Sequence, residues 1–378
     1  MTGLAESGTS TEAGSFDRIS RLDVSAYRIP TATPESDGTL SWDATTIVIV
    51  EATAGERCGL GYTYADSSTA RLIRDLLAGV VVGHDPMDIP GAWLAMIEAI
   101  RNLGRPGIAS MAVAAVDNAL WDLKAKVLGI PLATLFGRAR ERIPVYGSGG
   151  FTSYSINELQ DQLGGWADDG LAAVKMKVGR NPTVDVARVR AAREAIGPDT
   201  ALFVDANGAY ERKEALRFAA AFADLGVSWF EEPVSSNDLD GLRLIRDGGP
   251  AGMAITAGEY GYDLAYFRRM LEAGAVDTLQ ADATRCAGLS EFLRVGALCA
   301  SRSLRLSSHC APSIHVAAGC ALPAVVHLEY FFDHTRIECL AFDGAPTPRN
   351  GCLQPDLSRP GLGIELKRPD LERWQVSL

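Results

Sequence analysis

Seven acidic, basic and imidazole side chains recur at nearly even intervals along the chain, and together they could carry out acid–base chemistry around a metal ion: Lys177, Asp205, Glu231, Glu259, Asp282, His309 and Glu329. Neighbouring members are about 20 to 28 residues apart, the length that a strand, a crossover helix and two loops require. Each residue closes a short apolar run typical of a buried parallel strand. Polar residues repeated at strand ends with this period predict the active-site rim of a (β/α)8 barrel.

Three of these residues are carboxylates on consecutive predicted strands: Asp205, Glu231 and Glu259. Three carboxylates on one rim would repel one another strongly unless a cation lies between them. Oxygen ligands select a hard ion, and three carboxylates that leave positions open for water or substrate suit Mg2+. Any one of them alone is more simply a rim acid paired with a Lys or Arg. Three on adjacent strand ends favour a magnesium site.

Lys175 and Lys177 lie two positions apart on the second predicted strand, so both side chains point to the same side, into the barrel mouth. A second ammonium and a nearby Mg2+ would lower the pKa of Lys177 toward that of a usable base. The alternative is a solvated, charged strand end. The apolar residues on either side, Ala172-Ala173-Val174 and Val178, argue against that alternative.

Asp282 on the sixth predicted strand and His309 on the seventh would be neighbours across the rim. A carboxylate bonded to one imidazole nitrogen fixes the tautomer and leaves the other nitrogen for proton transfer. Only its position distinguishes His309 from the remaining histidines, which receive no role: His84, His315, His327 and His334. Ser307-Ser308, just before His309, are expected to supply local hydrogen bonds.

Glu329 ends the eighth predicted strand, opposite Lys175 and Lys177. There it could hold a substrate oxygen by a shared proton, the alternative being a structural ion pair. Together these parts describe one reaction: a carboxylate substrate binds Mg2+, a base removes its α-proton, and the metal and Lys175 stabilise the enediolate. Removing so weakly acidic a proton requires large electrostatic stabilisation of the oxyanion that forms.

Composition argues against a nucleic-acid-binding, secreted or membrane-spanning protein. The chain has 378 residues, 47% of them apolar, and a net charge of −11, which argues against nucleic acid and anionic membranes as partners. Its seven cysteines form no Cys-x-x-Cys pair and no zinc-like Cys/His cluster, as in a reduced cytoplasmic protein. Residues 1–15 are small and polar, without the apolar core of a signal peptide, and no apolar run approaches a membrane span.

The first part of the chain reads as an α+β domain. Strands are predicted at Ile19 to Ile29 and Thr45 to Glu51, with a turn-rich loop from Pro34 to Asp43 between them and a second loop from Gly59 to Ser68. Helical patterns follow at Thr69 to Leu77, Ile89 to Arg101 and Ile108 to Leu128. Strands followed by segregated helices indicate a separate domain that ends near residue 140.

Eight short strand patterns then alternate with helical ones, which predicts a parallel sheet closed into a barrel. The strands are expected at Ile143 to Gly147, Ala172 to Val178, Ala201 to Ala206, Ser228 to Glu232, Ala254 to Gly258, Thr278 to Ala281, Leu304 to Ser308 and Val326 to Phe331. Amphipathic helices are predicted at Ile156 to Asp169, Val184 to Ile196, Arg212 to Leu225, Leu239 to Arg246, Tyr266 to Ala273 and Leu289 to Ser301. Residues after about 341 are rich in Pro and Gly and are expected to pack back on the first domain.

The motifs around the candidate site residues resemble those of the enolase superfamily and, within it, the mandelate racemase subgroup. The matching motifs are Lys175-Met176-Lys177, Val204-Asp205-Ala206-Asn207-Gly208, Phe230-Glu231-Glu232-Pro233, Gly258-Glu259, Asp282, Ser307-Ser308-His309 and His327-Leu328-Glu329, together with the segments 114–123 and 131–137 of the first domain. The resemblance covers nearly the whole chain after the first residues, and the motifs in combination are highly specific.

The resemblance implies a modified (β/α)7β barrel under an α+β capping domain. The expected division is a flexible tail at 1–17, the capping domain at 18–140, the barrel at 141–340 and a C-terminal segment at 341–378 that packs on the cap. It implies Mg2+ on the three carboxylates, and Lys177 and the His309–Asp282 pair as bases on opposite faces of the substrate. Asn207 and Lys175 are expected to contact the substrate, and a homo-oligomer is expected by analogy.

Many family members with this pattern are acid-sugar dehydratases, which remove the α-proton and expel the β-hydroxyl with His309 as the acid. We therefore expect dehydration of a sugar acid to a 2-keto-3-deoxy acid. A racemase, epimerase or cycloisomerase would use the same bases, and a non-catalytic binding protein on this fold is a third class. One departure is Thr284-Arg285-Cys286-Ala287-Gly288, where the family more usually has Gly-Gly. Substrate-contacting candidates in the capping loops are Asp37, Trp42, Tyr62 and Tyr64.

Overall fold

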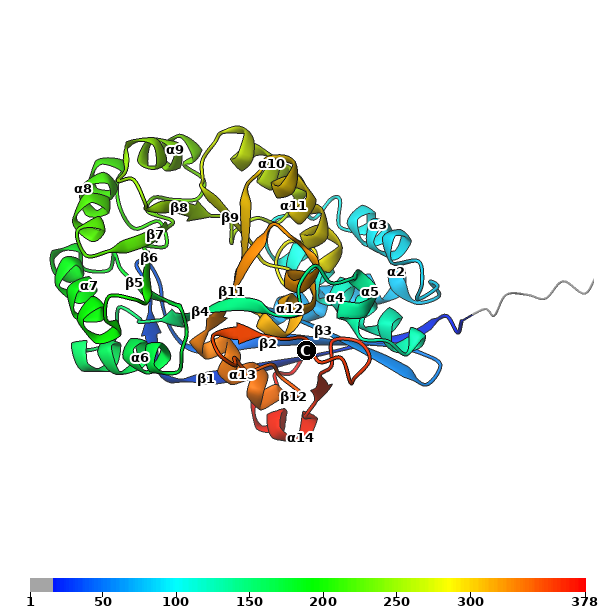
Figure 1. Cartoon of the computed structure of the whole chain (residues 1–378). Coiled ribbons are helices and arrows are strands. Elements are labelled where there is room, and N and C mark those ends of the chain that lie inside the picture. Colours follow the sequence, from blue (N-terminus) through cyan, green and yellow to red (C-terminus); the bar gives the residue numbers. More distant parts are fainter. Residues whose placement is uncertain (1–15) are drawn as a thin grey trace, which may run out of the picture.

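The computed structural model describes residues 16–378, so the expectations of a tail and of no signal peptide at residues 1–15 lie outside the described residues. Eight parallel strands form a closed barrel because the last of them pairs with the first (Figure 1). The strands are β4 (Ile143–Gly149), β5 (Ala173–Lys177), β6 (Ala201–Asp205), β7 (Val227–Glu231), β8 (Ala254–Ala257), β9 (Thr278–Ala281), β10 (Arg305–Ser308) and β11 (Val325–Phe331). The predicted fold class is confirmed, with each strand within two residues of its expected ends.

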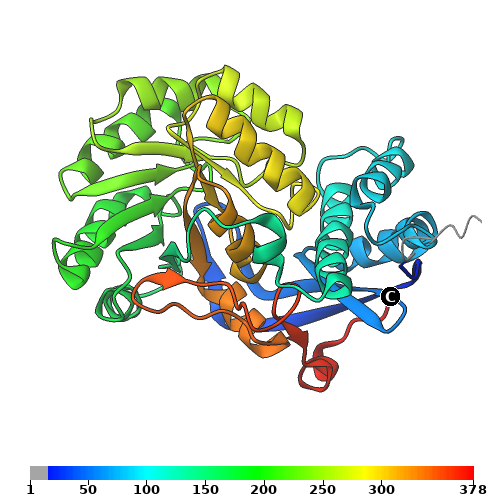
Figure 2. The same ribbon diagram turned by 45° about the vertical axis from the view of Figure 1, so that its right-hand side comes forward.

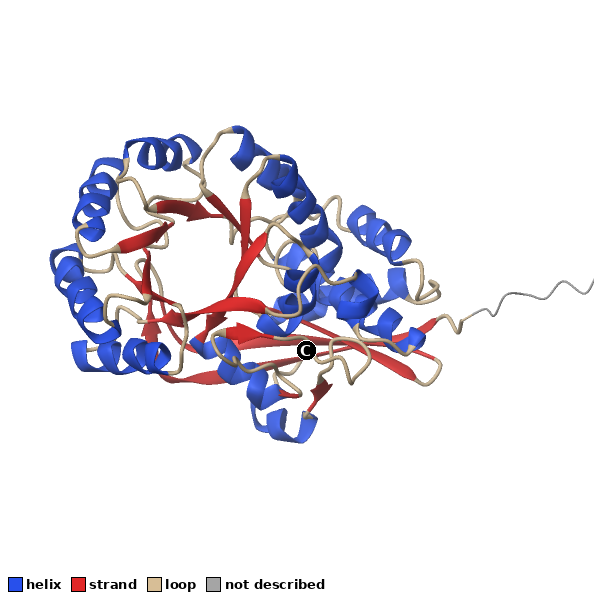
Figure 3. Cartoon of the chain, viewed as in Figure 1, coloured by secondary structure: helices blue, strands red, loops and turns tan. Residues whose placement is uncertain are grey.

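Helices surround this ring of strands (Figure 3). Those that connect consecutive barrel strands are α6 (Ile156–Asp168), α7 (Pro182–Ile196), α8 (Arg212–Ala223), α9 (Leu239–Gly248), α10 (Leu264–Glu272), α11 (Leu289–Ser301) and α12 (Pro312–Ala321). The sequence patterns did not reveal α12, and the reason is that its residues from Pro312 to Cys320 are all buried. A helix without a polar face has no amphipathic period to detect. A further helix, α13 (Phe332–Ala341), follows the last strand.

The N-terminal part forms an antiparallel sheet of β1 (Ile19–Ser36), β2 (Ser41–Ala54) and β3 (Arg57–Tyr64), called the capping sheet below. The helical segments that follow are α1 (Ser67–Leu72), the π-helix η1 (Ile73–Leu77), α2 (Ala78–Val81), α3 (Ile89–Ala99), α4 (Ile108–Leu128) and α5 (Leu132–Phe136). Figure 2 shows the blue capping sheet running from these helices to the barrel. The turn between β1 and β2 reaches the barrel rim, because Gly38 lies against the carbonyl groups of Val178 and Ala206.

The predicted loop from Gly59 to Ser68 is wrong over most of its length, which is strand β3. The glycines of this strand allow close packing. A Cβ on Gly59 would lie 2.3 Å from the carbonyl oxygen of Ala119, and one on Gly61 would lie 2.3 Å from that of Ala115. Glycine is therefore required here so that the sheet can approach helix α4 closely.

The chain after α13 contacts both the barrel and the capping sheet. It contains β12 (Phe342–Asp343), β13 (Cys352–Leu353), β14 (Glu365–Leu366), α14 (Arg368–Leu371) and the short 3-10 helix η2 (Glu372–Trp374). Strand β13 pairs antiparallel with the first barrel strand, β4. The backbone N–H of Val376 donates to the carbonyl of Ala26 in β1. None of the helices in the described part of the chain is long and apolar enough to cross a membrane.

Candidate active site

The two lysines of β5 point into the barrel mouth, where both reach Asp205 and Lys175 also pairs with two glutamates. Lys175 Nζ lies 2.7 Å from Glu231 Oε2, 2.7 Å from Glu329 Oε1 and 3.6 Å from Asp205 Oδ2. Lys177 Nζ lies 2.5 Å from Asp205 Oδ2. Strand register explains why these side chains meet. Lys177 is paired with Asp205, and Asp205 with Glu231, at one level of the barrel. The residues that the sequence placed on different strand ends are thus brought together.

The pKa of Lys177 differs from the sequence-based expectation. Burial favours its neutral form, but the Asp205 carboxylate outweighs burial and the neighbouring Lys175, so the pKa of Lys177 is raised. The predicted lowering rested on a second ammonium and a nearby Mg2+. With the Asp205 carboxylate facing the ammonium directly, attraction dominates and favours the charged form of Lys177.

Asp205, Glu231 and Glu259 form one compact, buried cluster of oxygens. One carboxylate oxygen from each can be chosen so that all three lie within 4.8 Å of one another. Burial and the charge of Asp205 raise the pKa of Glu231 to about 8. Burial acts in the same direction on Asp205, but Lys177 and Lys175 overcome it and lower the pKa of Asp205. Such a cluster of hard, like-charged ligands fits a divalent cation of the Mg2+ type.

His309 and Asp282 form the expected pair at the ends of β10 and β9. His309 Nδ1 lies 2.8 Å from Asp282 Oδ2, and the other oxygen of Asp282 accepts hydrogen bonds from the backbone and hydroxyl of Thr284. Burial disfavours the imidazolium, but Glu259 and Asp282 outweigh it and raise the pKa of His309. Its Nε2 lies 3.4 Å from Glu259 Oε2 and 3.3 Å from Cys310 Sγ. The ring therefore presents Nε2 to the other acids of the site.

Glu329 on β11 is fixed from three sides. Besides the ion pair with Lys175, its Oε2 accepts the backbone N–H of Cys310 at 2.8 Å, and its own N–H donates to the hydroxyl of Ser308. The expected local hydrogen bonding by this serine is observed. Burial opposes ionisation of Glu329, but Lys175 and His309 lower its pKa well below the usual value. Glu329 is therefore a carboxylate at neutral pH.

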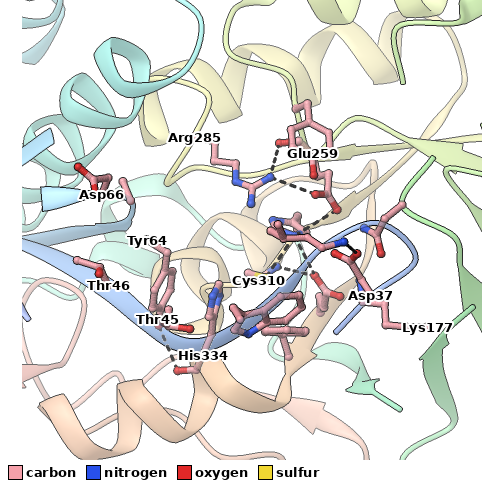
Figure 4. A pocket seen from close by; sticks show the side chains of 18 of the residues that line it. Asp37, Thr45, Thr46, Tyr64, Asp66, Lys177, Glu259, Arg285, Cys310 and His334 are labelled. Atoms are coloured by element: carbon pink, nitrogen blue, oxygen red, sulfur yellow. Dashed lines mark hydrogen bonds and ion pairs between the residues drawn. The ribbon is translucent and has the colours of Figure 1, made fainter. Parts of the chain in front are cut away.

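A cavity of about 330 Å³ opens between these residues and the capping loops (Figure 4). It is lined by Lys177, Asn207, Glu259, His309, Cys310 and Glu329 from the barrel, by Asp37, Trp42, Thr45, Thr46, Tyr64 and Asp66 from the N-terminal part, and by Arg285 and His334 among others. Asn207 has a left-handed backbone, with φ of 47°, and its buried Oδ1 has no partner among the described residues. That oxygen is free to accept a hydrogen bond from a ligand.

Of the four capping candidates, Asp37, Trp42 and Tyr64 line the cavity, whereas Tyr62 does not. The Tyr62 side chain is fully buried, and its hydroxyl donates to Glu338 Oε1 at 2.6 Å. Its expected substrate contact is wrong: Tyr62 shares a face of β3 with Tyr64, and both hydroxyls reach Glu338, but only Tyr64 extends to the cavity. Tyr62 belongs to the core between the capping sheet and α13.

Arg285 and His334 are cavity residues to which sequence reasoning gave no role. Arg285 Nη1 lies 3.2 Å from Glu259 Oε1, and its guanidinium stands 5.3 Å from the ring centre of Tyr260. His334 stacks on Tyr64 with 3.5 Å between ring centres. Arg285 lies in the segment that departs from the family pattern, which was the available signal. Nothing local marks His334, because the path of α13 alone brings it to the cavity.

Helix α4 holds the loop that carries Asp282 and Arg285. The Asn118 amide donates to the carbonyl of Ala283 and accepts from the N–H of Leu289, while both oxygens of Asp117 accept from Ser290. In the same loop Ala287 has φ of 65°, a left-handed conformation that glycine adopts more easily.

Family models match both parts of the chain. Residues 23–137 match the mandelate racemase / muconate lactonizing enzyme N-terminal domain, and residues 158–371 match the enolase C-terminal domain-like family. The chain belongs to the enolase superfamily, in the mandelate racemase subgroup. The predicted family is confirmed.

Two solved structures and two characterised relatives show the closeness of the match. A mandelate racemase/muconate lactonizing enzyme-like protein from Rubrobacter xylanophilus is 56% identical, with a TM-score of 0.93 over 95% of this chain and 100% of that one. A racemase from Streptomyces coelicolor with bound magnesium is 32% identical, with a TM-score of 0.89 over the same shares. The 3,6-anhydro-alpha-L-galactonate cycloisomerase of Streptomyces coelicolor is 34% identical over 95% of this chain and 99% of its own. The L-talarate/galactarate dehydratase of Salmonella typhimurium is 31% identical over 88% and 86%.

Proposed function

We propose that this protein removes the α-proton of a sugar-acid carboxylate in a Mg2+-dependent reaction, and that it dehydrates the acid to a 2-keto-3-deoxy acid. The observation that carries the proposal is the single cavity onto which Lys177, His309 and Glu259 all open. Two bases and a metal-ligand carboxylate facing one space of about 330 Å³ suit a small polyhydroxy acid better than a macromolecule. Relatives that act on sugar acids support the substrate class.

The cation would be held by Asp205, Glu231 and Glu259, whose oxygens are close enough to share one ion. When bound, Mg2+ supplies positive charge that stabilises the enediolate form of the substrate carboxylate. Lys175, already bound to two of the acids at this site, adds a fixed ammonium next to that charge. Glu329 and Asn207, which also line the cavity, would bind substrate oxygens.

The two bases come from distant strands of the ring. Lys177 ends β5 and His309 follows β10, so β4 and β11 separate them in one direction round the barrel and β6 to β9 in the other. A substrate between them presents one face to each. One base takes the α-proton, and His309 Nε2 donates a proton to the departing β-hydroxyl, which leaves as water. The remaining enol then takes up a proton at C3 to give the keto acid.

A second candidate is an isomerisation that uses the same bases without loss of water. The observation in its favour is the similarity to a cycloisomerase, at 34% identity over almost the entire length of both chains. In that reaction the enediolate receives a proton, or closes a ring, where the dehydratase would expel a hydroxyl group. The choice depends on whether a β-hydroxyl of the substrate lies beside His309.

Proton exchange tests both candidates. Sugar acids are incubated with the protein and Mg2+ in deuterated water and followed by NMR. Loss of water with one deuterium taken up at C3 of the 2-keto-3-deoxy product is expected for at least one acid. Exchange with an unchanged molecular formula would favour the isomerase. If neither exchange nor dehydration occurred across a broad panel of aldonates, aldarates and their lactones, the chain would be a binding protein and the proposal would be wrong.

A further inference from the structure

Three buried side chains beside the carboxylate cluster form a second group of converging ligand atoms. His309, Cys310 and Glu329 each offer one atom, and these atoms all lie within 4.8 Å of one another. His309 Nε2 is 3.3 Å from Cys310 Sγ and 3.9 Å from Glu329 Oε2. All three residues line the cavity. We propose that they bind a thiophilic divalent cation of the Zn2+ class, and that this ion blocks the active site.

The separation of the imidazole nitrogen from the thiol sulfur matches a tetrahedral zinc site. Bonds of about 2.0 Å to nitrogen and 2.3 Å to sulfur, at tetrahedral angles, place those two ligand atoms about 3.5 Å apart. The observed separation of His309 Nε2 from Cys310 Sγ is 3.3 Å. One nitrogen, one thiolate and one carboxylate oxygen also make the mixed ligand set that zinc prefers over magnesium. Three ligands leave the fourth position to water.

The second ring nitrogen of His309 strengthens this assignment. A histidine that binds zinc almost always donates its other N–H to a carboxylate or carbonyl, which orients the ring and raises its basicity. Asp282 provides that acceptor, with 2.8 Å between its Oδ2 and His309 Nδ1. The pair that serves a proton-transfer base is therefore also the pair that serves a zinc ligand.

The backbone at Cys310 brings its sulfur to the preceding imidazole. Cys310 and Ala311 have φ of 49° and 44°, left-handed values that are unfavourable for residues with a Cβ. Strain of this kind is kept at sites where side-chain placement matters. No spacing rule for zinc motifs detects this group, because two ligands are adjacent in the chain and the third comes from the neighbouring strand.

An ion bound at this position would inhibit proton transfer by His309. Coordination occupies the Nε2 lone pair that His309 needs for proton transfer and releases the thiol proton of Cys310 to solvent. The carboxylate trio uses a different set of atoms, so Mg2+ and the thiophilic ion would bind side by side. Inhibition should therefore persist at saturating Mg2+. The binding itself is independent of the proposed function and can be measured on its own.

Cd2+ is the probe, since thiolate coordination gives it a charge-transfer absorbance. The Mg2+-saturated protein is titrated with Cd2+, and binding of Zn2+ is measured by calorimetry on the same sample. We expect about one equivalent of tight binding that Cys310→Ala weakens at least about 100-fold and His309→Asn abolishes. The control is Cys320→Ala, which removes a buried thiol on α12 that does not line the cavity.

The binding measurements can overturn the proposed Zn2+ site in two ways. Cd2+ absorbance and Zn2+ affinity that are unchanged in both Cys310→Ala and His309→Asn would overturn the proposal, as would binding that excess Mg2+ displaces, since the ion would then lie on the carboxylate trio. If Cys310→Ala does not fold, His309→Asn decides by the same binding measurement, which needs no turnover. Where exchange activity is present, Zn2+ should inhibit the Cys320→Ala protein as strongly as the unaltered one.

Discussion

Lys175 and Lys177 stand two positions apart on β5 but have different partners. Lys175 is held between Glu231 and Glu329, whereas Lys177 forms its ion pair with Asp205 and lines the cavity. Only a lysine with a free side toward the substrate can take up a proton from it. The contacts therefore favour Lys177 as the base and Lys175 as a fixed charge, which is the division that the family resemblance implied.

Removing either base should stop proton transfer at one face of the substrate. Lys177→Ala and His309→Asn are each expected to lower turnover at least about 100-fold, because a positioned acid–base group contributes that much or more. Deuterium exchange, followed separately for the two α-epimers of an active acid, should vanish for one epimer in each variant. Lys213→Ala, which removes an exposed lysine on α8, is the control. Full activity in either base variant would show that the bases are wrongly assigned.

The sequence predicts the place of a site residue where a chemically suitable side chain stands at the end of a predicted barrel strand. Asp205, Glu231 and Glu259 were identifiable because each follows a buried strand at the barrel period. Arg285 and His334 were not, since they reach the cavity by the path of a loop and of a helix that follows the last strand. The pKa of Lys177 depends on the charge that Asp205 presents to its ammonium group, which no local sequence pattern specifies.

The hairpin of β1 and β2 carries a buried acid next to the cavity wall. Glu35 is 1% exposed, and its Oε2 accepts the indole N–H of Trp42, a cavity residue, while Oε1 has no partner among the described residues. Burial and the nearby Asp333 raise the pKa of Glu35 to about 8, despite the opposing hydrogen bond from Trp42 and the charge of Arg336. Ionisation of Glu35 therefore lowers the free energy of unfolding, and the size of this effect depends on pH.

The direction of this pH effect on stability follows from the different pKa values of Glu35 in the folded and unfolded chain. The unfolded chain releases the Glu35 proton near pH 4.5 and the folded chain near pH 8, so this residue lowers stability as pH rises through that window. Glu35→Gln removes the effect and retains an acceptor for Trp42. Relative to the unaltered protein, its Tm should rise between pH 5 and pH 8 by at least about 2 °C. The same change at Glu98, exposed on α3, should leave the pH profile alone; equal profiles for Glu35→Gln and the unaltered protein would refute the assignment.

Element prediction failed where local signals had another cause. The segment from Gly59 to Ser68 was predicted as a loop, but Gly59 and Gly61 allow strand β3 to approach α4. Helix α12 has no polar face and so no period. Both errors arise because packing against a distant segment, absent from any local window, decides the outcome.

The whole molecule concentrates negative charge at the centre of its barrel. Asp205, Glu231 and Glu259 are buried together, with Lys175 and Lys177 as the cations in contact with them on the β5 side. Buried like charges destabilise the folded state unless they are compensated. A ligand that compensates them only in the folded chain must raise its stability.

Mg2+ should therefore stabilise the protein. At a concentration about 100-fold above its dissociation constant it adds about 2.7 kcal/mol, or about 3 °C in Tm for a chain of this size. Calorimetric scans with Mg2+ and with a chelator measure the shift. Glu231→Gln should lose most of it, whereas Glu194→Gln on α7 should keep it. A shift of equal size in all three proteins would place the ion elsewhere.

Helix α4 is part of the N-terminal domain by sequence, yet Asp117 and Asn118 hold the loop that carries Asp282, the partner of His309. Engineers who exchange the specificity loops of such enzymes would naturally graft a new N-terminal half onto an existing barrel. In this chain such a chimera would break the hydrogen bonds that position its second base. A productive graft should keep residues 108–128 with the recipient barrel, or transfer residues 282–290 together with the donor helix.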